Sequence, residues 1–300
     1  MDVTFLVVAD THFGTHTVLP GSTALNPRPE PQRTTLAVVN QGFIAQMNLV
    51  AGRPYPAAIG GHVQAPRGVL VAGDLTEDGK PQEWDEFVAH YGHSGKDAQL
   101  AMPVFAVQGN HDKNRGDGVA RALTKRHGGL YYGWRWDDLH LLALGEGPDR
   151  WVLEWLATQL ESIGTEAPVV LWMHYPLLGP YSRGNWFGKS SYAERLHDTI
   201  EGHRIIAIFH GHFHGSGHYR WRGYDVYNVG SPKHRMRSFA VVRVTDDWLT
   251  VSSWNVEAER FWWWHRKPTT PDGPDRQEPV DIDVGADGRF RPAIPYPIGL

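Results

Sequence analysis

Five short apolar runs in this chain end in side chains that bind metal ions or protons, and this recurrence constrains the fold more than any other feature. The clearest run is Pro103 to Val107, which predicts a buried strand and is soon followed by Gly109, Asn110, His111 and Asp112. Glycine permits a tight turn, so the polar side chains would project beyond the strand end. Gly, Asn and Asp are also the commonest turn residues, so this tetrapeptide alone would indicate an ordinary turn. Its repetition at four other strand ends favours a functional site.

The other four runs have the same organisation. They are Val3 to Ala9 before Asp10 and His12, Val69 to Ala72 before Asp74, Val169 to Met173 before His174, and Ile205 to Phe209 before His212 and His214. Near-continuous apolar runs are typical of strands that are covered on both faces. Ligands of open α/β sheets bind beyond the carboxyl ends of the strands. We therefore expect one edge of the fold to collect the candidate metal ligands, which are Asp10, His12, Asp74, Asn110, His174, His212 and His214.

The segments between and after these runs predict the fold class. Apolar residues recur at helical spacing within 34–50, 81–91, 119–127 and 149–162. The later strands have no helix between them, which favours antiparallel pairing; they are 225–229, 239–244, 249–256 and 260–264. Alternating strands and helices followed by a run of strands predict an α/β protein with two sheets packed face to face and helices outside. From Arg266 onward Pro and Asp dominate, so we expect one domain over 1–265 and a Pro-rich tail over 266–300 that packs on it or extends from it.

The composition limits the chemistry and the partners. The chain has 300 residues and no cysteine, which excludes disulfides and thiolate metal sites, whereas 17 histidines supply imidazole ligands. The formal net charge of −4 argues against broad, charge-driven binding to nucleic acid or to anionic membranes. The N-terminal segment reads as a strand rather than a signal peptide, and no stretch is long and apolar enough to span a bilayer. We expect a cytoplasmic protein, and a homo-oligomer is compatible with the sequence.

The candidate ligands suit a centre of two metal ions. Carboxylate, imidazole and amide oxygen are ligands for ions such as Mn, Fe and Zn, and not for soft copper. Each oxygen of a carboxylate can bind a separate ion, so Asp74 is the natural bridge if the remaining ligands divide between two ions. Two ions about 3.5–4 Å apart can hold a hydroxide and clamp a phosphoryl group. His111 would face the same cavity without being needed as a ligand, which leaves it free for proton transfer. Asp112 is either a turn residue or the orienting partner of His111; we favour the partner, because catalytic histidines commonly need one.

Taken together, the blocks resemble the signature of the calcineurin-like metallophosphoesterases. They are Asp10-Thr11-His12, Gly73-Asp74, Gly109-Asn110-His111-Asp112, His174 and Gly211-His212-Phe213-His214, in this order within residues 3–257. The segment from Gly73 to Gly79 is also similar to the phosphodiesterases of the class III cyclic nucleotide group, which is a narrower match.

The resemblance implies a four-layer α/β/β/α sandwich of two mixed sheets flanked by helices, with a dinuclear centre. It implies one ion held by Asp10, His12, Asp74 and His214. It implies a second ion held by Asp74, Asn110, His174 and His212. In this family pattern His111 lies at the leaving oxygen of the substrate.

We therefore expect a hydrolase of phosphoric esters, with a phosphodiesterase acting on a small or medium substrate as the preferred interpretation. A metal-bridging hydroxide would attack the ester, and His111 would act as general acid. A phosphomonoesterase would use the same centre, and a metal-free binding scaffold of the same fold is the alternative from another class. The basic segment from Lys233 to Arg237 is expected to be solvated surface, and contact with an anion is the alternative interpretation. The run from Phe261 to Trp264 cannot all be core, because neighbours on a strand point to opposite faces.

Overall fold

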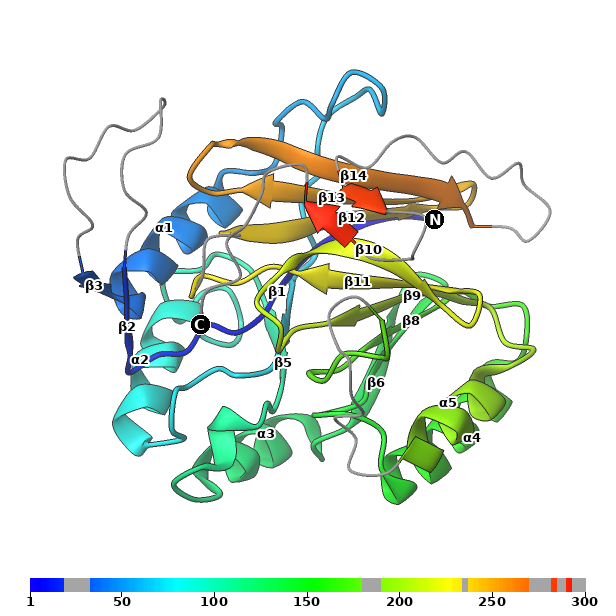
Figure 1. Cartoon of the computed structure of the whole chain (residues 1–300), viewed down its shortest axis with the longest axis horizontal. Coiled ribbons are helices and arrows are strands. Elements are labelled where there is room, and N and C mark those ends of the chain that lie inside the picture. Colours follow the sequence, from blue (N-terminus) through cyan, green and yellow to red (C-terminus); the bar gives the residue numbers. More distant parts are fainter. Residues whose placement is uncertain (19–32, 180–189, 234–236, 270–281, 285–289, 293–300) are drawn as a thin grey trace.

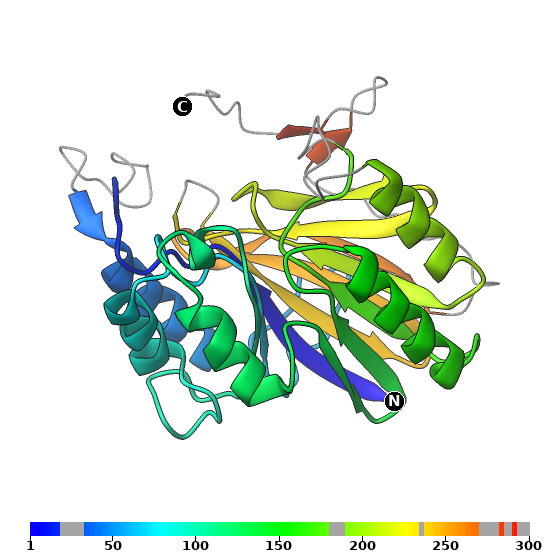
Figure 2. The ribbon, with the colours of Figure 1, turned by 90° about the horizontal axis from the view of Figure 1, so that it is seen from below.

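Two six-stranded sheets pack face to face between two layers of helices, as the ribbon shows in two orientations (Figures 1 and 2). The computed structural model describes residues 1–18, 33–179, 190–233, 237–269, 282–284 and 290–292. In Figure 2 helices α1, α2 and α3 lie on one side of the two sheets and helices α4 and α5 on the other. The expected four-layer sandwich of two mixed sheets is confirmed.

The first sheet has the strand order β14-β13-β12-β1-β4-β5. Its strands are β1 (Asp2–Val8), β4 (Val69–Ala72), β5 (Val104–Val107), β12 (Ser238–Thr245), β13 (Trp248–Asn255) and β14 (Arg260–Pro268). Strands β1, β4 and β5 are parallel, so their carboxyl ends meet at one edge. Strands β12, β13 and β14 continue the sheet in antiparallel pairs, as their lack of intervening helices predicts.

The second sheet has the strand order β10-β11-β9-β8-β7-β6. Its strands are β6 (Tyr132–Trp136), β7 (Leu139–Ala143), β8 (Val169–Trp172), β9 (Ile205–His210), β10 (Ser216–Trp221) and β11 (Tyr224–Val229). Strands β7, β8 and β9 are parallel. The sequence did not predict β6 or β10, because both mix polar, Gly and aromatic residues. Strand β11 joins β9 in parallel, against the antiparallel pairing expected for that part of the chain.

Of the helices in the described chain, the first four are close to their predicted ranges. The helices are α1 (Leu36–Asn48), α2 (Pro81–Tyr91), α3 (Gly118–His127), α4 (Arg150–Ile163) and α5 (Ser190–Ile200). Side-chain caps set two of the starts: the Thr35 hydroxyl accepts a hydrogen bond from the N–H of Val38, and the Asp149 carboxylate accepts from the N–H of Trp151. Two short strand pairs complete the described chain, β2 (His16–Val18) with β3 (Arg33–Thr35) and β15 (Ile282–Val284) with β16 (Phe290–Pro292).

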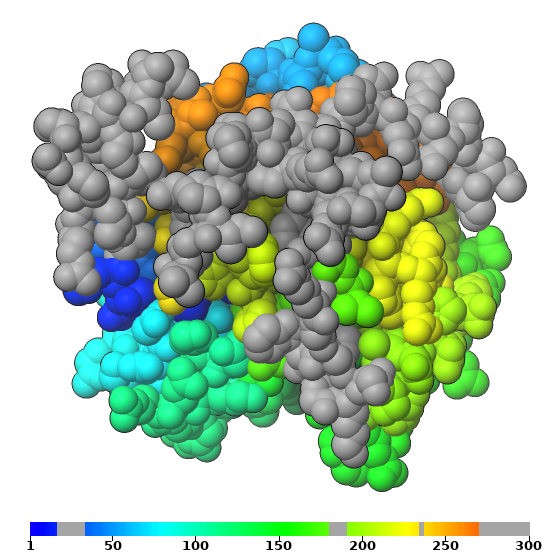
Figure 3. Space-filling model, in the orientation of Figure 1, coloured from blue at the N-terminus to red at the C-terminus, as the bar shows by residue number. Residues whose placement is uncertain are grey.

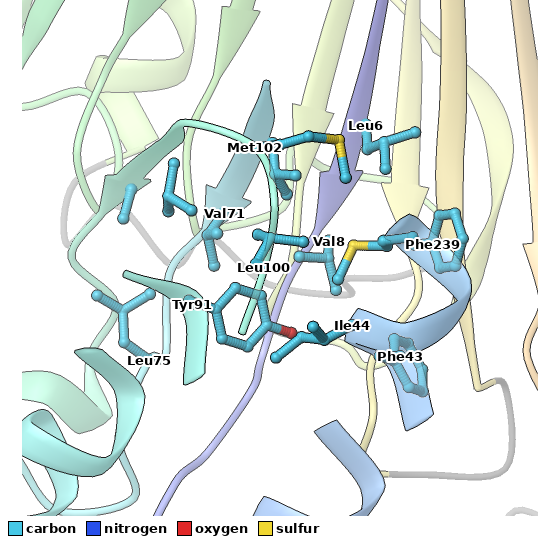
Figure 4. Close-up of a cluster of buried hydrophobic side chains, with 14 of the residues drawn as sticks. Leu6, Val8, Phe43, Ile44, Val71, Leu75, Tyr91, Leu100, Met102 and Phe239 are labelled. Carbon is cyan, nitrogen blue, oxygen red and sulfur yellow. The ribbon is translucent and has the colours of Figure 1, made fainter. Parts of the chain in front are cut away.

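Three apolar clusters fill the spaces between the layers. Strand β1 is buried on both faces: Val3, Phe5 and Val7 pack between the sheets, whereas Leu6 and Val8 pack beneath helices α1 to α3. Figure 4 shows this outer cluster, in which α1 and α2 cover β1 and its neighbours. A third cluster lies between the second sheet and helices α4 and α5. In the space-filling view the residues around α2 and α3 and those around α4 and α5 lie on opposite sides (Figure 3). Close packing on both faces holds the strand ends in fixed positions.

A β-bulge decides the placement of the aromatic run in β14. Ser253 pairs with Trp263 but the next residue, Trp254, pairs with Phe261, so Trp262 is the extra residue. Trp263 and Trp262 both pack against the inter-sheet cluster, while Phe261 packs against the outer one. Only Trp263 of this run is buried, so the prediction that the four residues cannot all be core is confirmed, while the bulge places the neighbours Trp262 and Trp263 against the same cluster. Most of the predicted tail lies outside the described residues. Within the described part of the chain, no helix combines the length and the apolar character that a membrane span requires.

Candidate metal centre

The seven predicted ligands lie at the carboxyl ends of five parallel strands. They follow β1 (Asp10, His12), β4 (Asp74), β5 (Asn110), β8 (His174) and β9 (His212, His214). Strands β1, β4 and β5 belong to the first sheet and β8 and β9 to the second, so both sheets contribute. Two groups of ligand atoms form, in each of which the atoms lie within 4.8 Å of one another; one is Asp10, His12, Asp74 and His214, and the other is Asp74, His174 and His212.

The backbone at these positions departs from the strand conformation. Left-handed φ angles occur at Asp10 (55°), His12 (45°), Asp74 (50°), His212 (66°) and His214 (56°). This conformation costs an L-residue about 1–2 kcal/mol, although Asp, Asn and His adopt it more readily than most. These five candidate ligands therefore leave the plane of their sheets and turn toward the shared edge.

Glycines allow the ligand turns to approach one another closely. A Cβ atom on Gly109 would lie 2.2 Å from both the backbone nitrogen and Oδ1 of Asp74. A Cβ atom on Gly211 would lie 2.6 Å from the Cβ of Ala9 and 2.9 Å from Oδ2 of Asp10. Neither position can hold a side chain without moving a candidate ligand.

The group around His174 presents several lone pairs to one point. The ring Nδ1 of His174 lies 2.9 Å from the carbonyl oxygen of Ala72, which can only accept, so Nδ1 carries the proton. The Nε2 atom then faces Oδ1 of Asn110 at 3.0 Å and Oδ2 of Asp74 at 3.3 Å. It also faces Nδ1 of His212 at 3.2 Å. A cation at this point would satisfy all four atoms at once.

The group around Asp10 has the same character. Nε2 of His12 lies 3.1 Å from Nε2 of His214 and 3.6 Å from Oδ2 of Asp74. Oδ1 of Asp10 accepts from the N–H of His212 at 2.9 Å and lies 3.6 Å from Nε2 of His214. Oδ2 of Asp10 is buried and accepts no hydrogen bond from the described residues. A buried carboxylate oxygen without a donor is costly, and a metal ion supplies the missing partner, so this donor set fits such an ion.

The electrostatics of the site favour a positive charge between the ligands. Burial raises the pKa of Asp10 well above its ordinary value. Burial also acts to raise the pKa of Asp74, but His174, His12 and the N–H of His111 outweigh it and hold that pKa far below its usual range. Burial acts to lower the pKa of His174, yet the Asp74 and Asp10 carboxylates raise it to about 9. The carboxylates thus draw in a cation, which is a proton on His174 when no metal ion competes.

His111 lies beside the ligands without joining either group that shares Asp74. Its Nδ1 lies 2.7 Å from the backbone carbonyl oxygen of Glu77 and donates to it. The ring is 4.8 Å from the ring of His12, measured between centroids, and 31% of the side chain is exposed. Because Nδ1 is used by this bond, Nε2 is the atom that remains for proton exchange with a substrate.

The role predicted for Asp112 as the orienting partner of His111 is wrong. Its buried carboxylate accepts hydrogen bonds from the N–H groups of Gly109 (2.8 Å), Leu75 (3.2 Å) and Thr76 (2.8 Å), and from the Thr76 hydroxyl (2.7 Å). Four donors therefore occupy Asp112, and the carbonyl oxygen of Glu77 orients His111 instead. Asp112 acts as the turn residue of the alternative interpretation and ties the loop after β4 to the loop after β5.

Two residues beside the centre were not predicted as part of it. The Glu77 carboxylate lies 2.8 Å from Nδ1 of His12 and 2.9 Å from the ammonium group of Lys233. Burial acts to raise the pKa of Glu77, but His12 and Lys233 lower it to about 2. Lys233 was expected at the solvated surface, yet only 19% of its side chain is exposed. The available signal was the position of Glu77 three residues after Asp74, within the segment that carried the narrower resemblance.

A further group of metal-type side chains, His218, Asp225 and His265, does not fit a metal ion. The two imidazole rings stack at 4.0 Å and 16°, so their nitrogen lone pairs run side by side and do not converge. Asp225 already accepts from His218 at 2.8 Å and from Lys267 at 2.5 Å. This buried ion-pair network joins β10 and β11 to β14 across the sandwich.

Comparison with known proteins agrees with this geometry. The family model for calcineurin-like phosphoesterases matches residues 3–216, so the chain belongs to that family. The matched range contains all seven candidate ligands. The expectation drawn from the sequence blocks is confirmed at this level.

Solved structures of the same fold are distant in sequence. A dimetal phosphatase from Danio rerio is 14% identical, with a TM-score of 0.55 over 84% of this chain and 95% of that chain. GAP50, the anchor in the inner membrane complex of Plasmodium, is 14% identical, with a TM-score of 0.56 over 88% of each chain. Identities this low establish a shared fold alone. No curated protein sequence matches the chain.

Proposed function

We propose that this chain is a phosphodiesterase that works with two metal ions. The observation that carries the proposal is the convergence of two ligand groups on one carboxylate, Asp74. Asp10, His12 and His214 would hold one ion with Asp74, and Asn110, His174 and His212 would hold the other. Ions such as Mn, Fe or Zn in these positions would polarise the phosphoryl oxygens and activate a water molecule for in-line attack.

His111 is the proposed general acid. Its Nδ1–H is committed to the carbonyl oxygen of Glu77, so a proton on Nε2 is present only in the imidazolium form. In that form Nε2 donates its proton to the leaving oxygen as the ester bond breaks, and Nδ1 stays bound. The bond to Glu77 thereby fixes the direction from which the proton arrives.

The charge balance around the centre supports a diester substrate. A phosphate monoester at neutral pH carries more negative charge than a diester and benefits from cations that are not otherwise engaged. The described lysines on the ligand-bearing loops are instead paired with carboxylates: Lys80 with Asp78 and Glu83, Lys113 with Glu146, and Lys233 with Glu77. With these lysines engaged, we favour the singly charged diester as the substrate.

A matched pair of substrates tests the proposal. Protein loaded with Mn²⁺ is assayed on bis(4-nitrophenyl) phosphate and on 4-nitrophenyl phosphate, which share the leaving group and differ in charge. We expect a higher kcat/KM for the diester, and no turnover of either by Asp74→Asn. A higher kcat/KM for the monoester would replace the proposal with a phosphomonoesterase. Loss of neither activity in the variant would remove Asp74 from the mechanism.

A further inference from the structure

Three side chains from distant parts of the chain form a connected series that ends on His12. His12 follows β1, Glu77 follows β4, and Lys233 follows β11. Oε2 of Glu77 lies 2.8 Å from Nδ1 of His12 and 2.9 Å from Nζ of Lys233. The side chain of His12 is fully buried, while those of Glu77 and Lys233 are 26% and 19% exposed.

The positions of the protons follow from what His12 must do. Its Nε2 faces Asp74 and His214, so Nε2 has to be unprotonated to bind a metal ion. Nδ1 then carries the proton and donates it to Glu77. Lys233 donates to the same carboxylate oxygen. The 3.4 Å between Nζ of Lys233 and Nδ1 of His12 is therefore the separation of two donors that share one acceptor.

The loop that carries Lys233 is tied to the same ligand turn by a second contact. The Ser231 hydroxyl donates to the carbonyl oxygen of Asp10 at 3.0 Å, and it accepts from the N–H of Lys233 at 3.0 Å. One short segment thus reaches the backbone of Asp10 and, through Glu77, the ring of His12. The Ser231–Asp10 contact joins residues 221 positions apart in the chain, and the Lys233–Glu77 contact joins residues 156 positions apart.

We propose that Lys233 and Glu77 are positioning residues for the metal ion held by Asp10, His12, Asp74 and His214. Lys233 fixes the carboxylate of Glu77, and that carboxylate fixes the tautomer and the orientation of the His12 ring. Removal of such a hydrogen-bonded partner of a ligating histidine typically costs about 10–100-fold in metal affinity. The other ion is spared, because His174 is oriented by the backbone carbonyl of Ala72. The inference rests on the proposed metal centre, but not on which ester is cleaved.

Lys233→Met is the diagnostic variant, because the lost charge and the lost positioning change the affinity for the metal ion in opposite directions. Loss of a positive charge beside the centre would by itself raise the affinity for a cation. A fall in affinity must therefore come from the lost support of Glu77. Glu77→Gln cannot separate the two effects, since loss of a negative charge lowers cation affinity as well. Lys233→Arg retains both the charge and a donor.

Lys113→Met is the matched control. Lys113 also pairs with a carboxylate, that of Glu146 at 2.7 Å, close to His111 in the chain, and Glu146 belongs to neither group of candidate ligands. Lys113→Met removes one positive charge near the centre, as Lys233→Met does. Any effect of charge alone appears in both methionine variants.

The experiment is a calorimetric titration of the metal-free proteins with Mn²⁺, with thermal unfolding measured alongside. We expect two binding events in the wild type, with one event weakened about 10–100-fold in Lys233→Met and retained in Lys113→Met and Lys233→Arg. In a Glu77→Gln background, Lys233→Met should add no further loss. In the zinc-loaded protein, the proton on Nδ1 of His12 should be visible by nitrogen-15 NMR, and in Lys233→Met it should exchange faster with water.

Other results would overturn the inference. Unchanged Mn²⁺ affinity in Lys233→Met with a raised KM would make Lys233 a substrate contact. An equal loss of Mn²⁺ affinity in Lys113→Met would mean that Lys233 gives Glu77 no specific support. Two normal binding events in every variant would refute the positioning role while leaving the metal centre intact, whereas no Mn²⁺ binding by the wild type would refute the centre itself.

Discussion

Asp74 offers the sharpest test of the shared centre. Its Oδ2 lies 3.6 Å from Nε2 of His12 and 3.3 Å from Nε2 of His174, so this one oxygen faces both ligand groups. Its Oδ1 accepts from the N–H of His111 at 2.9 Å. Asp74→Asn keeps an acceptor for His111 and tolerates the left-handed backbone at φ 50°, but it removes the charge that both groups share. We expect the variant to fold and to bind neither ion.

The expected change in the free energy of unfolding follows from the linkage between metal binding and folding. An ion present at 100 times its dissociation constant adds about 2.7 kcal/mol to the free energy of unfolding. Two ions therefore add roughly 5.4 kcal/mol to the wild type. The increment should fall close to zero in Asp74→Asn. In His212→Ala, which removes a ligand from one group only, roughly half should remain.

The assay is denaturant unfolding with and without Mn²⁺. His210→Gln is the control, because the buried His210 hydrogen bonds to the carbonyl oxygen of Gly211 and to the hydroxyl of Tyr219 and belongs to neither ligand group. Its metal increment should equal that of the wild type even if the variant is less stable. An Asp74→Asn variant that retains half or more of the increment would refute a shared carboxylate, because one ion would then bind without it.

Three further outcomes follow from the structure. His111→Ala should retain both ions and lose turnover steeply on alkyl esters but much less on nitrophenyl esters, whose leaving group departs unprotonated; equal losses across the series would assign His111 to charge stabilisation instead. Asp112→Ala leaves three buried N–H groups without an acceptor, so the free energy of unfolding should fall by roughly 3 kcal/mol or more, and a change below about 1 kcal/mol would contradict the loop contacts. Burial lowers the pKa of His265 to about 3, below its ordinary value of about 6.5, so the unfolded state takes up the proton first on acidification. Stability is therefore lost as pH falls from about 6.5 toward 3, by about 2 kcal/mol between pH 7 and pH 5, and unfolding at both pH values should show a smaller loss in His265→Gln.

The sequence predicted the ligand edge because its cause is local. A buried parallel strand must be apolar throughout, and the residue that follows it must leave the sheet, so Asp10, Asp74 and His174 stand out beside their strands. The same logic fails for β10, whose residues include Gly217 and Arg220 and whose strand character comes only from pairing with β11.

Contacts between distant segments had no local signal. Glu77 and Lys233 meet across 156 residues, and neither lies at a spacing that predicts the other. The sequence therefore predicts Lys233 to be part of a basic surface segment. Proximity in the sequence pairs Asp112 with the adjacent His111, but the turn after β5 brings the Asp112 carboxylate to the loop after β4. There the N–H groups of Leu75 and Thr76 donate to it, together with the N–H of Gly109 from its own turn.

The left-handed backbone at the candidate ligands sets a conflict between heat resistance and the proposed metal binding. Five ligand residues hold a conformation that costs on the order of 1–2 kcal/mol each, which together approaches the whole stability of an ordinary domain. The buried strands that enter these turns sustain that cost, and glycine or asparagine at the same positions would reduce it. Selection of this chain for thermostability alone, without a demand for metal binding, should therefore replace its histidine ligands early. A heat-resistant relative that retains all five left-handed residues would have to recover the same free energy elsewhere, through its core or through the ions themselves.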